Sequence, residues 1–203
     1  MGTTIRNATP ADIPQILNFI QALADYERAP EAVVATEADL LRDGFGPSPF
    51  YCCLIAEFDS QPAGFALYFF DYSTWLGRPG IYLEDLFVYP ELRGRGIGKL
   101  LLEKVAAIAV EKGCARLKWA VLDWNTPAID FYRAMGAEFM DEWRNVRVSG
   151  EALARLAAAD TKPAKDVAAG AAHSFQEASP LRQAQGRLST PVAAATLAQD
   201  GAQ

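Results

Sequence analysis

Residues 89–102 read Tyr89-Pro90-Glu91-Leu92-Arg93-Gly94-Arg95-Gly96-Ile97-Gly98-Lys99-Leu100-Leu101-Leu102, and the rest of the chain is arranged around them. The apolar run 81–88 before this stretch is typical of a buried strand, and apolar residues at helical spacing after it predict an amphipathic helix. Glycines at alternate positions leave backbone N–H groups uncovered, and a helix start adds partial positive charge. The stretch therefore predicts an anion site, most naturally for a phosphate group.

The glycine spacing excludes the two common nucleotide fingerprints. Gly94, Gly96 and Gly98 are spaced G-x-G-x-G, whereas dinucleotide-binding turns need G-x-G-x-x-G. A P-loop needs Ser or Thr after its lysine, and here Leu100 follows Lys99. A glycine-rich turn without any ligand has a similar pattern, so the rest of the chain has to decide.

Composition narrows the class of protein. A chain of 203 residues that is 51% hydrophobic can form one domain with a real core and an appendage. Its net charge of −6 argues against nucleic-acid binding and suits a cationic substrate. No apolar run approaches the roughly 18 residues of a membrane span, and the N-terminus lacks the apolar core of a signal peptide. We expect a cytoplasmic protein without membrane or nucleic-acid partners.

Cysteine and histidine chemistry is not expected. Cys52, Cys53 and Cys114 have no metal-ligand spacing, and the adjacent pair points to opposite faces of a strand, as small core residues would. Cys114 follows the negative end of a helix, which disfavours a thiolate. The single histidine, His173, lies in a polar tail. We therefore expect no metal and no cysteine nucleophile.

The order of elements indicates an α+β fold, an α/β sandwich on a mixed sheet. Strands are predicted at 4–6, 50–58, 64–70, 81–88, 116–122 and 143–148. Helices are predicted from Thr9 through Leu23, after Thr36, after Gly98, at 128–135 and at 149–158. Residues 1–158 form the predicted domain. Residues 159–203 have the composition of a disordered tail, with a docking peptide as the alternative.

Several segments, taken in order, resemble the diamine acetyltransferase family of the GNAT superfamily. They are residues 23–27, 43–46, 82–88, 93–98, 124–127 and 131–137. That family acetylates spermidine and spermine, and a close branch acts on thialysine. The resemblance covers residues 3–158. It implies the GNAT fold, with a mixed, mostly antiparallel central sheet flanked by helices, acetyl-CoA as co-substrate and a homodimer.

The resemblance also implies two sets of site residues. The implied cofactor contacts are Leu86, Phe87, Val88, Arg93, Gly94, Arg95, Gly96, Ile97, Gly98, Lys99, Asn125 and Tyr132. The implied contacts to the amine are Tyr26, Glu27, Trp75, Glu84 and Glu142. Within these sets Tyr132 corresponds to the general acid, and Glu84 to the group that helps remove a proton.

The chemistry of acetyl transfer gives reasons for these residues that do not depend on the resemblance. An alkyl amine has a pKa near 10.4, so about one molecule in 2,500 is neutral at pH 7, a cost of roughly 4.6 kcal/mol. A carboxylate near the amine reduces that cost. On a regular strand Glu84 and Asp85 face opposite ways, so one of them lines the pocket, and the resemblance favours Glu84. Backbone N–H groups near Phe87 and Val88 polarise the thioester carbonyl if the strand is bulged there.

A phenol such as that of Tyr132 stays protonated at pH 7 and can donate to a departing thiolate. The resemblance apart, this tyrosine is as well explained as a packed core residue. The remaining alternatives are a CoA-binding module without catalysis and an acetyltransferase for a protein N-terminus or lysine. In the second, the region of Tyr26, Glu27 and Trp75 would line a peptide groove.

Overall fold

A computed structural model describes residues 2–159 of the chain. The chain divides into two compact units, residues 1–138 and 139–203. The predicted tail, 159–203, lies outside the described residues except for Ala159, the last residue of a helix. None of the helices in the described range has the length and apolar character that a membrane crossing requires.

The first unit contains a five-stranded sheet in the order β1-β2-β3-β4-β5. The first four strands pair antiparallel, and β5 runs parallel to β4, which confirms a mixed, mostly antiparallel sheet. The strands are β1 Thr3–Asn7, β2 Cys52–Phe58, β3 Gln61–Ser73, β4 Arg78–Val88 and β5 Leu117–Lys118. The strand predicted at 116–122 is therefore reduced to two residues.

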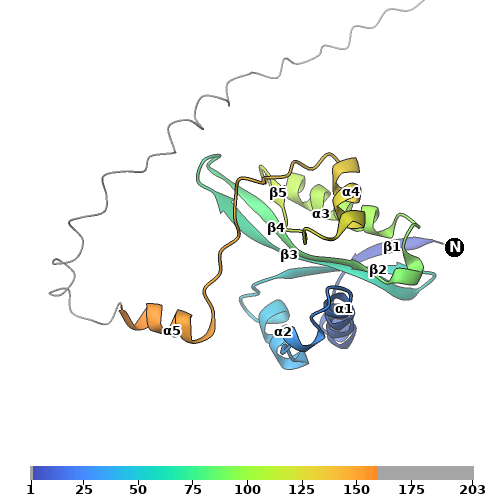
Figure 1. The fold of residues 1–203 in the computed structure, drawn as a ribbon. Coiled ribbons are helices and arrows are strands. Elements are labelled where there is room, and N and C mark those ends of the chain that lie inside the picture. Colours follow the sequence, from blue (N-terminus) through green and yellow to red (C-terminus); the bar gives the residue numbers. More distant parts are fainter. Residues whose placement is uncertain (1, 160–203) are drawn as a thin grey trace, which may run out of the picture. The chain divides into compact units, whose positions relative to one another are not determined.

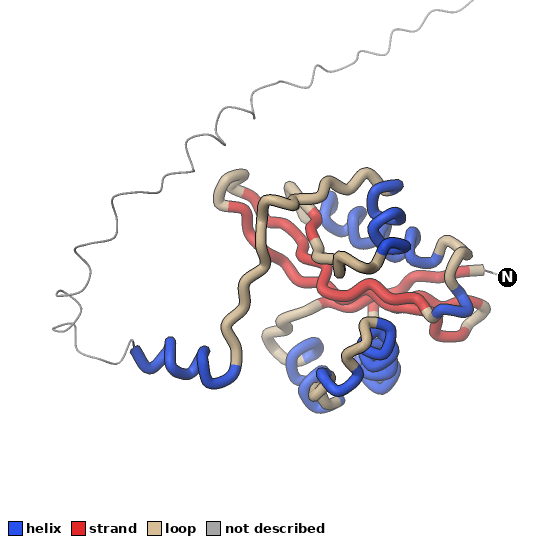
Figure 2. Tube along the Cα trace, viewed as in Figure 1, coloured by secondary structure: helices blue, strands red, loops and turns tan. Residues whose placement is uncertain are grey.

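Helices cover both faces of this sheet. Figures 1 and 2 show α1 and α2 on one face and α3 and α4 on the other. Their bounds are α1 Ile13–Tyr26, α2 Glu37–Phe45, α3 Ile97–Glu111 and α4 Thr126–Ala134, with 3-10 turns at η1 Pro10–Asp12, η2 Pro30–Ala32 and η3 Pro90–Leu92. The predicted α+β architecture is confirmed.

An aromatic core fixes the end of β4 beneath α1. Phe19 of α1 stacks on Phe65 of β3, with ring centroids 5.3 Å apart. Phe65 pairs with Phe87 of β4, so both rings lie on the same face of the sheet. All three side chains are buried. Because Phe87 lies shortly before the glycine turn, this packing places that turn at a fixed point.

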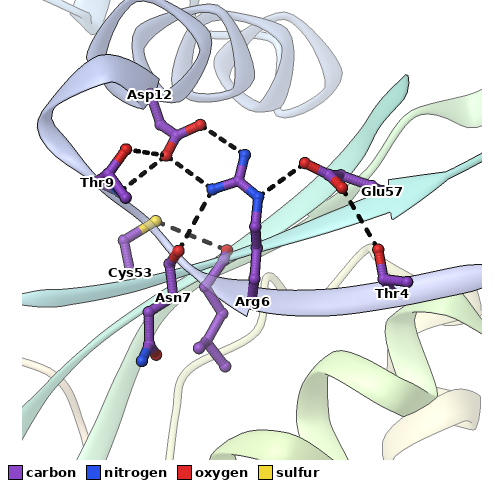
Figure 3. A network of polar contacts seen from close by, with 8 residues as sticks. Thr4, Arg6, Asn7, Thr9, Asp12, Cys53 and Glu57 are labelled. Carbon is purple, nitrogen blue, oxygen red and sulfur yellow. Dashed lines mark hydrogen bonds and ion pairs between the residues drawn. The ribbon is translucent and has the colours of Figure 1, made fainter. Parts of the chain in front are cut away.

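A polar network fixes the start of α1, as Figure 3 shows. Arg6 of β1 donates two hydrogen bonds to the carboxylate of Asp12, at 2.8 and 2.7 Å, and one to Glu57 of β2 at 2.7 Å. Asp12 also accepts from the N–H and hydroxyl of Thr9, each at 2.8 Å. The bond from Arg6 holds the pKa of Asp12 well below its usual range. The helix is thereby tied to two strands.

The described residues of the second unit, 139–159, contain one helix, α5 Gly150–Ala159, which confirms the predicted terminal helix. The strand predicted at 143–148 is wrong, because this segment has no strand structure. Its apolar residues Trp143, Val146 and Val148 are exposed. Apolar alternation produces a strand only where a neighbouring edge can pair with it.

Candidate active site

The glycine turn is an open backbone cradle. Gly94 and Gly96 have φ values of 75° and 80°, in the left-handed region that favours glycine, and Gly96 caps the N-terminus of α3. A Cβ atom added at either position would meet no other atom within 4 Å. The turn therefore leaves free space in front of backbone N–H groups at a helix start, which suits an anion such as a diphosphate.

The side chains of this turn point back to the protein. Arg93 donates from Nε to the carbonyl of Val88 at 3.0 Å, and its guanidinium lies 4.4 Å from the ring centroid of Tyr26. The guanidinium of Arg95 lies 5.1 Å from the ring centroid of Phe58. Both cations are thus held by contacts within the protein, and the backbone is the part of the turn that remains available to an anion.

The sheet splits beside this turn. Within residues 2–159, β5 pairs with β4 only at Ile81 and Tyr82, whereas β3 follows β4 as far as Val88. The far half of β4, residues 83–88, thus has an edge that no described strand covers. Such an edge offers backbone donors and acceptors to an extended ligand.

A hydrogen bond between Tyr26 and Asn125 joins the two helical layers at the split. The hydroxyl of Tyr26, the last residue of α1, donates to Oδ1 of Asn125 at 3.0 Å. The same oxygen accepts from the N–H of Ala128 at 3.4 Å and so caps α4. Because α1 and α4 lie on opposite faces, this bond connects the layers where β5 has left β4.

Tyr132 lies on α4, next to the ring of Trp119, at a centroid distance of 5.0 Å. It is 8% exposed. Burial, and then the charge of Glu27, raise the pKa of Tyr132 to about 12. The phenol is therefore protonated at neutral pH and available as a hydrogen-bond donor.

A β-bulge lies at the two acidic residues in β4. Tyr68 pairs with Leu83 and Leu67 pairs with Asp85, so Glu84 is the extra residue. Pairing is regular from Asp85 to Phe87, so Asp85 lies on the face of Leu67 and Phe87, which packs under α1, and the bulge moves Leu83 to the opposite face. Glu84 is exposed and Asp85 is half-buried, and that the two side chains face different ways stays a prediction.

The bulge also lies earlier in β4 than the sequence analysis required. Pairing with β3 is continuous from Asp85 to Val88, so the strand is regular at Phe87 and Val88. A bulge at those two residues is not observed. Any backbone N–H that polarises a carbonyl there belongs to the open edge of β4.

Asp85 is a site residue that the sequence analysis did not select. Burial raises its pKa to about 7, and the charges of Glu84 and then Glu27 add to the effect. Loss of solvent also raises the pKa of Glu27. The three carboxylates therefore form an electronegative group beside Tyr132, and no lysine or arginine pairs with any of them among residues 2–159. Such a group suits a cationic ligand.

Comparison with known proteins identifies the family. Residues 17–137 match the family described as "Acetyltransferase (GNAT) family". The chain belongs to the GNAT family of acetyltransferases. It is 48% identical over 164 residues to thialysine N-epsilon-acetyltransferase of Bos taurus, covering 75% of this chain and 96% of that protein.

Two further relatives agree with this assignment. The human spermidine/spermine N(1)-acetyltransferase-like protein 1 is 38% identical over 163 residues, covering 75% of this chain and 23% of that protein. A solved integron cassette protein of V. cholerae superposes with a TM-score of 0.66 at 27% identity, covering 77% of this chain and 98% of that one. This GNAT protein is an acetyl-CoA-dependent N-acetyltransferase.

One of the predicted amine contacts in this GNAT enzyme, Trp75, lies away from the carboxylate group. Trp75 is 69% exposed in the turn between β3 and β4. Glu84 lies further along β4. At about 3.3 Å per residue, it is on the order of 20 Å from Arg78, the first residue of the strand after the turn that holds Trp75. Glu142 belongs to the second unit and is described apart from the site. Tyr26, Glu27, Glu84, Asn125 and Tyr132 all lie in the first unit, around the split in the sheet.

Proposed function

We propose that this enzyme acetylates the side-chain amine of a small, lysine-like amino acid, a thialysine-type acceptor. The observation that carries the proposal is the carboxylate group of Glu27, Glu84 and Asp85 beside the protonated phenol of Tyr132. The higher identity to the thialysine enzyme, over almost its whole length, supports an amino acid over a polyamine.

In the proposed arrangement the backbone of residues 94–99 holds the diphosphate of acetyl-CoA. The open edge at Leu86–Val88 and the amide of Asn125 hold its pantetheine arm, which supplies the thioester that is to be cleaved. The amine nitrogen bonds directly to the acetyl carbon while the carbon–sulfur bond breaks, so no covalent enzyme intermediate forms. The ammonium loses one proton before attack and a second once the carbon–nitrogen bond has formed, while the sulfur gains one, so one proton leaves to solvent.

The leaving proton of the amine goes to a carboxylate. A general base works best when its pKa is near the operating pH. Asp85, with a pKa near 7, meets that condition, whereas Glu84 is the exposed neighbour that the resemblance selects. We propose that Asp85 accepts the proton, directly or through water, and that Glu84 and Glu27 hold the cationic end of the acceptor.

Tyr132 supports the departing sulfur. A phenol with a pKa of about 12 is a weaker acid than an ordinary thiol, whose pKa is about 8.5. Complete proton transfer from the phenol to the thiolate, before the nitrogen has released its own proton, is therefore unfavourable by about 5 kcal/mol. We propose that Tyr132 first stabilises the developing negative charge by a hydrogen bond and then donates its proton to the sulfur, while the second proton of the nitrogen, released after attack, restores the phenol.

The deciding experiment measures thiol release and product mass for thialysine, lysine, spermidine, putrescine and a lysine peptide. We expect thialysine and lysine to be the best acceptors by kcat/KM. Preference for spermidine would move the proposal to polyamines, and activity restricted to the peptide would move it to proteins. We also propose a homodimer, which light scattering after gel filtration tests.

A further inference from the structure

Arg28 is a cation held next to the proposed amine site. It follows Glu27 at the end of α1, and its guanidinium carbon lies 4.7 Å from the ring centroid of Trp124. Trp124 in turn lies 6.1 Å from the ring of Tyr26 and directly precedes Asn125. Arg28 is therefore beside the hydrogen bond that joins α1 to α4.

The backbone of Arg28 is held in an uncommon conformation. Its φ is 63°, in the left-handed region, where residues other than glycine are infrequent. Its N–H donates to the carbonyl of Asp25 at 3.2 Å. The N–H of Ala29 donates to the carbonyl of Ala24 at 2.9 Å, so this is the left-handed residue that commonly ends a helix. Here the conformation ends the helix and directs the chain so that Arg28 reaches Trp124.

No carboxylate of the described chain pairs with Arg28, although Arg28 directly follows Glu27 of the carboxylate group. Its planar guanidinium keeps donors available for a two-point bond to a carboxylate. The two charges of the site thus have opposite signs, carried by consecutive residues. A ligand that complements both carries an ammonium and a carboxylate.

The separation of these two groups agrees with a lysine-like molecule. In lysine the side-chain nitrogen and the carboxyl carbon are six bonds apart. Two residues of an extended backbone span the same number of bonds, so the distance is roughly 7 Å. Side chains from two adjacent residues, whose Cα atoms are about 3.8 Å apart, readily cover that distance when they diverge. We infer that Arg28 determines acceptor specificity by binding the α-carboxylate of a lysine-like substrate. This inference rests on the proposed function and deepens it.

The test compares two acceptors that differ in a single group. Lysine and 1,5-diaminopentane carry the same terminal amine and chain, and only lysine has the carboxylate. For Arg28→Gln we expect the KM for lysine to rise by about 30-fold, the loss expected for a charge-assisted bond. The KM for 1,5-diaminopentane stays within about 2-fold of the wild-type value, because Arg28 makes no contact with it. The kcat for both amines is unchanged.

Two more variants sharpen the result. Arg28→Lys keeps the charge and loses the planar fork, so part of the preference for lysine returns. Arg28→Glu reverses the charge, so 1,5-diaminopentane becomes the better acceptor. The control is Lys112→Gln, which removes an exposed cation at the end of α3 and leaves both KM values unchanged.

An equal rise of both KM values in Arg28→Gln would overturn the inference, because it would show a general loss of structure around Trp124. An unchanged KM for lysine would overturn it as well. If the wild-type enzyme acetylated 1,5-diaminopentane and not lysine, the inference would fail together with the proposed acceptor. If the wild-type enzyme acetylated neither, while lysine peptides or polyamines reacted, the proposed function itself would fail.

Discussion

Replacing Asp85 by asparagine is expected to stabilise this enzyme and to do so more at neutral than at acid pH. In the folded protein burial and the nearby carboxylates raise the pKa of Asp85 from 3.8 to about 7. At about 1.4 kcal/mol per pKa unit, this rise corresponds to about 4 kcal/mol. A native carboxyl with a raised pKa binds its proton more tightly than the unfolded chain does.

The sign follows from that difference in proton binding. Stability from the protonated Asp85 is fully present below about pH 4 and is lost as the pH rises to about 7, because the folded state then has to hold a buried charge. An asparagine has no such proton. The advantage of Asp85→Asn over wild type therefore grows with pH and reaches about 4 kcal/mol at pH 7.5, relative to its value below pH 4.

Urea unfolding of both proteins at pH 5.0 and 7.5 measures this advantage. We expect it to narrow by about 2 kcal/mol at the lower pH, and the comparison of two pH values removes any constant effect of the amide. The control is Glu31→Gln, an exposed carboxylate that does not contribute to the pKa of Asp85, for which surface substitutions predict a change within about 0.5 kcal/mol. An advantage of Asp85→Asn that stayed constant with pH, or widened at pH 5.0, would refute the account of a buried, strained carboxyl.

Three further outcomes are expected. Tyr132→Phe lowers kcat by about 100-fold without changing acetyl-CoA binding, as loss of a proton donor should. The thiol-release assay measures this, and a kcat within about 2-fold of wild type would contradict the role of Tyr132. Tyr26→Phe removes the bond to Asn125, so amide hydrogen exchange in the first turn of α4 accelerates. The control Tyr89→Phe removes the 3.1 Å bond that Gln15 of α1 donates to Tyr89, and it leaves exchange in α4 unchanged. Asp12→Asn lowers the free energy of unfolding by about 2 kcal/mol at pH 7, and the loss shrinks as the pH falls below about 4, because the pKa of that carboxyl is depressed in the folded state; an effect independent of pH would contradict this.

The parts of the site that the sequence could predict are those set by local backbone chemistry. The glycines at 94 and 96 permit left-handed φ values at little cost, and the turn has them. Asn125 before Thr126 and Pro127 is a local helix cap, and it caps α4. These features depend on a few neighbouring residues.

The parts that the sequence could not predict depend on contacts between distant segments. Leu83 and Asp85, two residues apart, lie on opposite faces only because β3 pairs with β4 across a bulge, and period-two alternation gives no sign of a bulge. The one signal was two adjacent acids inside a buried run. Likewise, the alternation at 143–148 does not say whether a partner edge exists, and the structure has no strand there.

The short pairing between β4 and β5 has a consequence for turnover. Within the described chain, the β5 side of the split is tied to β3 and β4 by two residue pairs, by the ion pairs of Arg116 and Lys118 with Asp71, and across the split by the Tyr26 bond to Asn125. A ligand that hydrogen-bonds along the open edge of β4 supplies the backbone contacts that a longer strand would have made. Product release then requires these backbone contacts along β4 to break, so their number sets part of the cost of releasing the product.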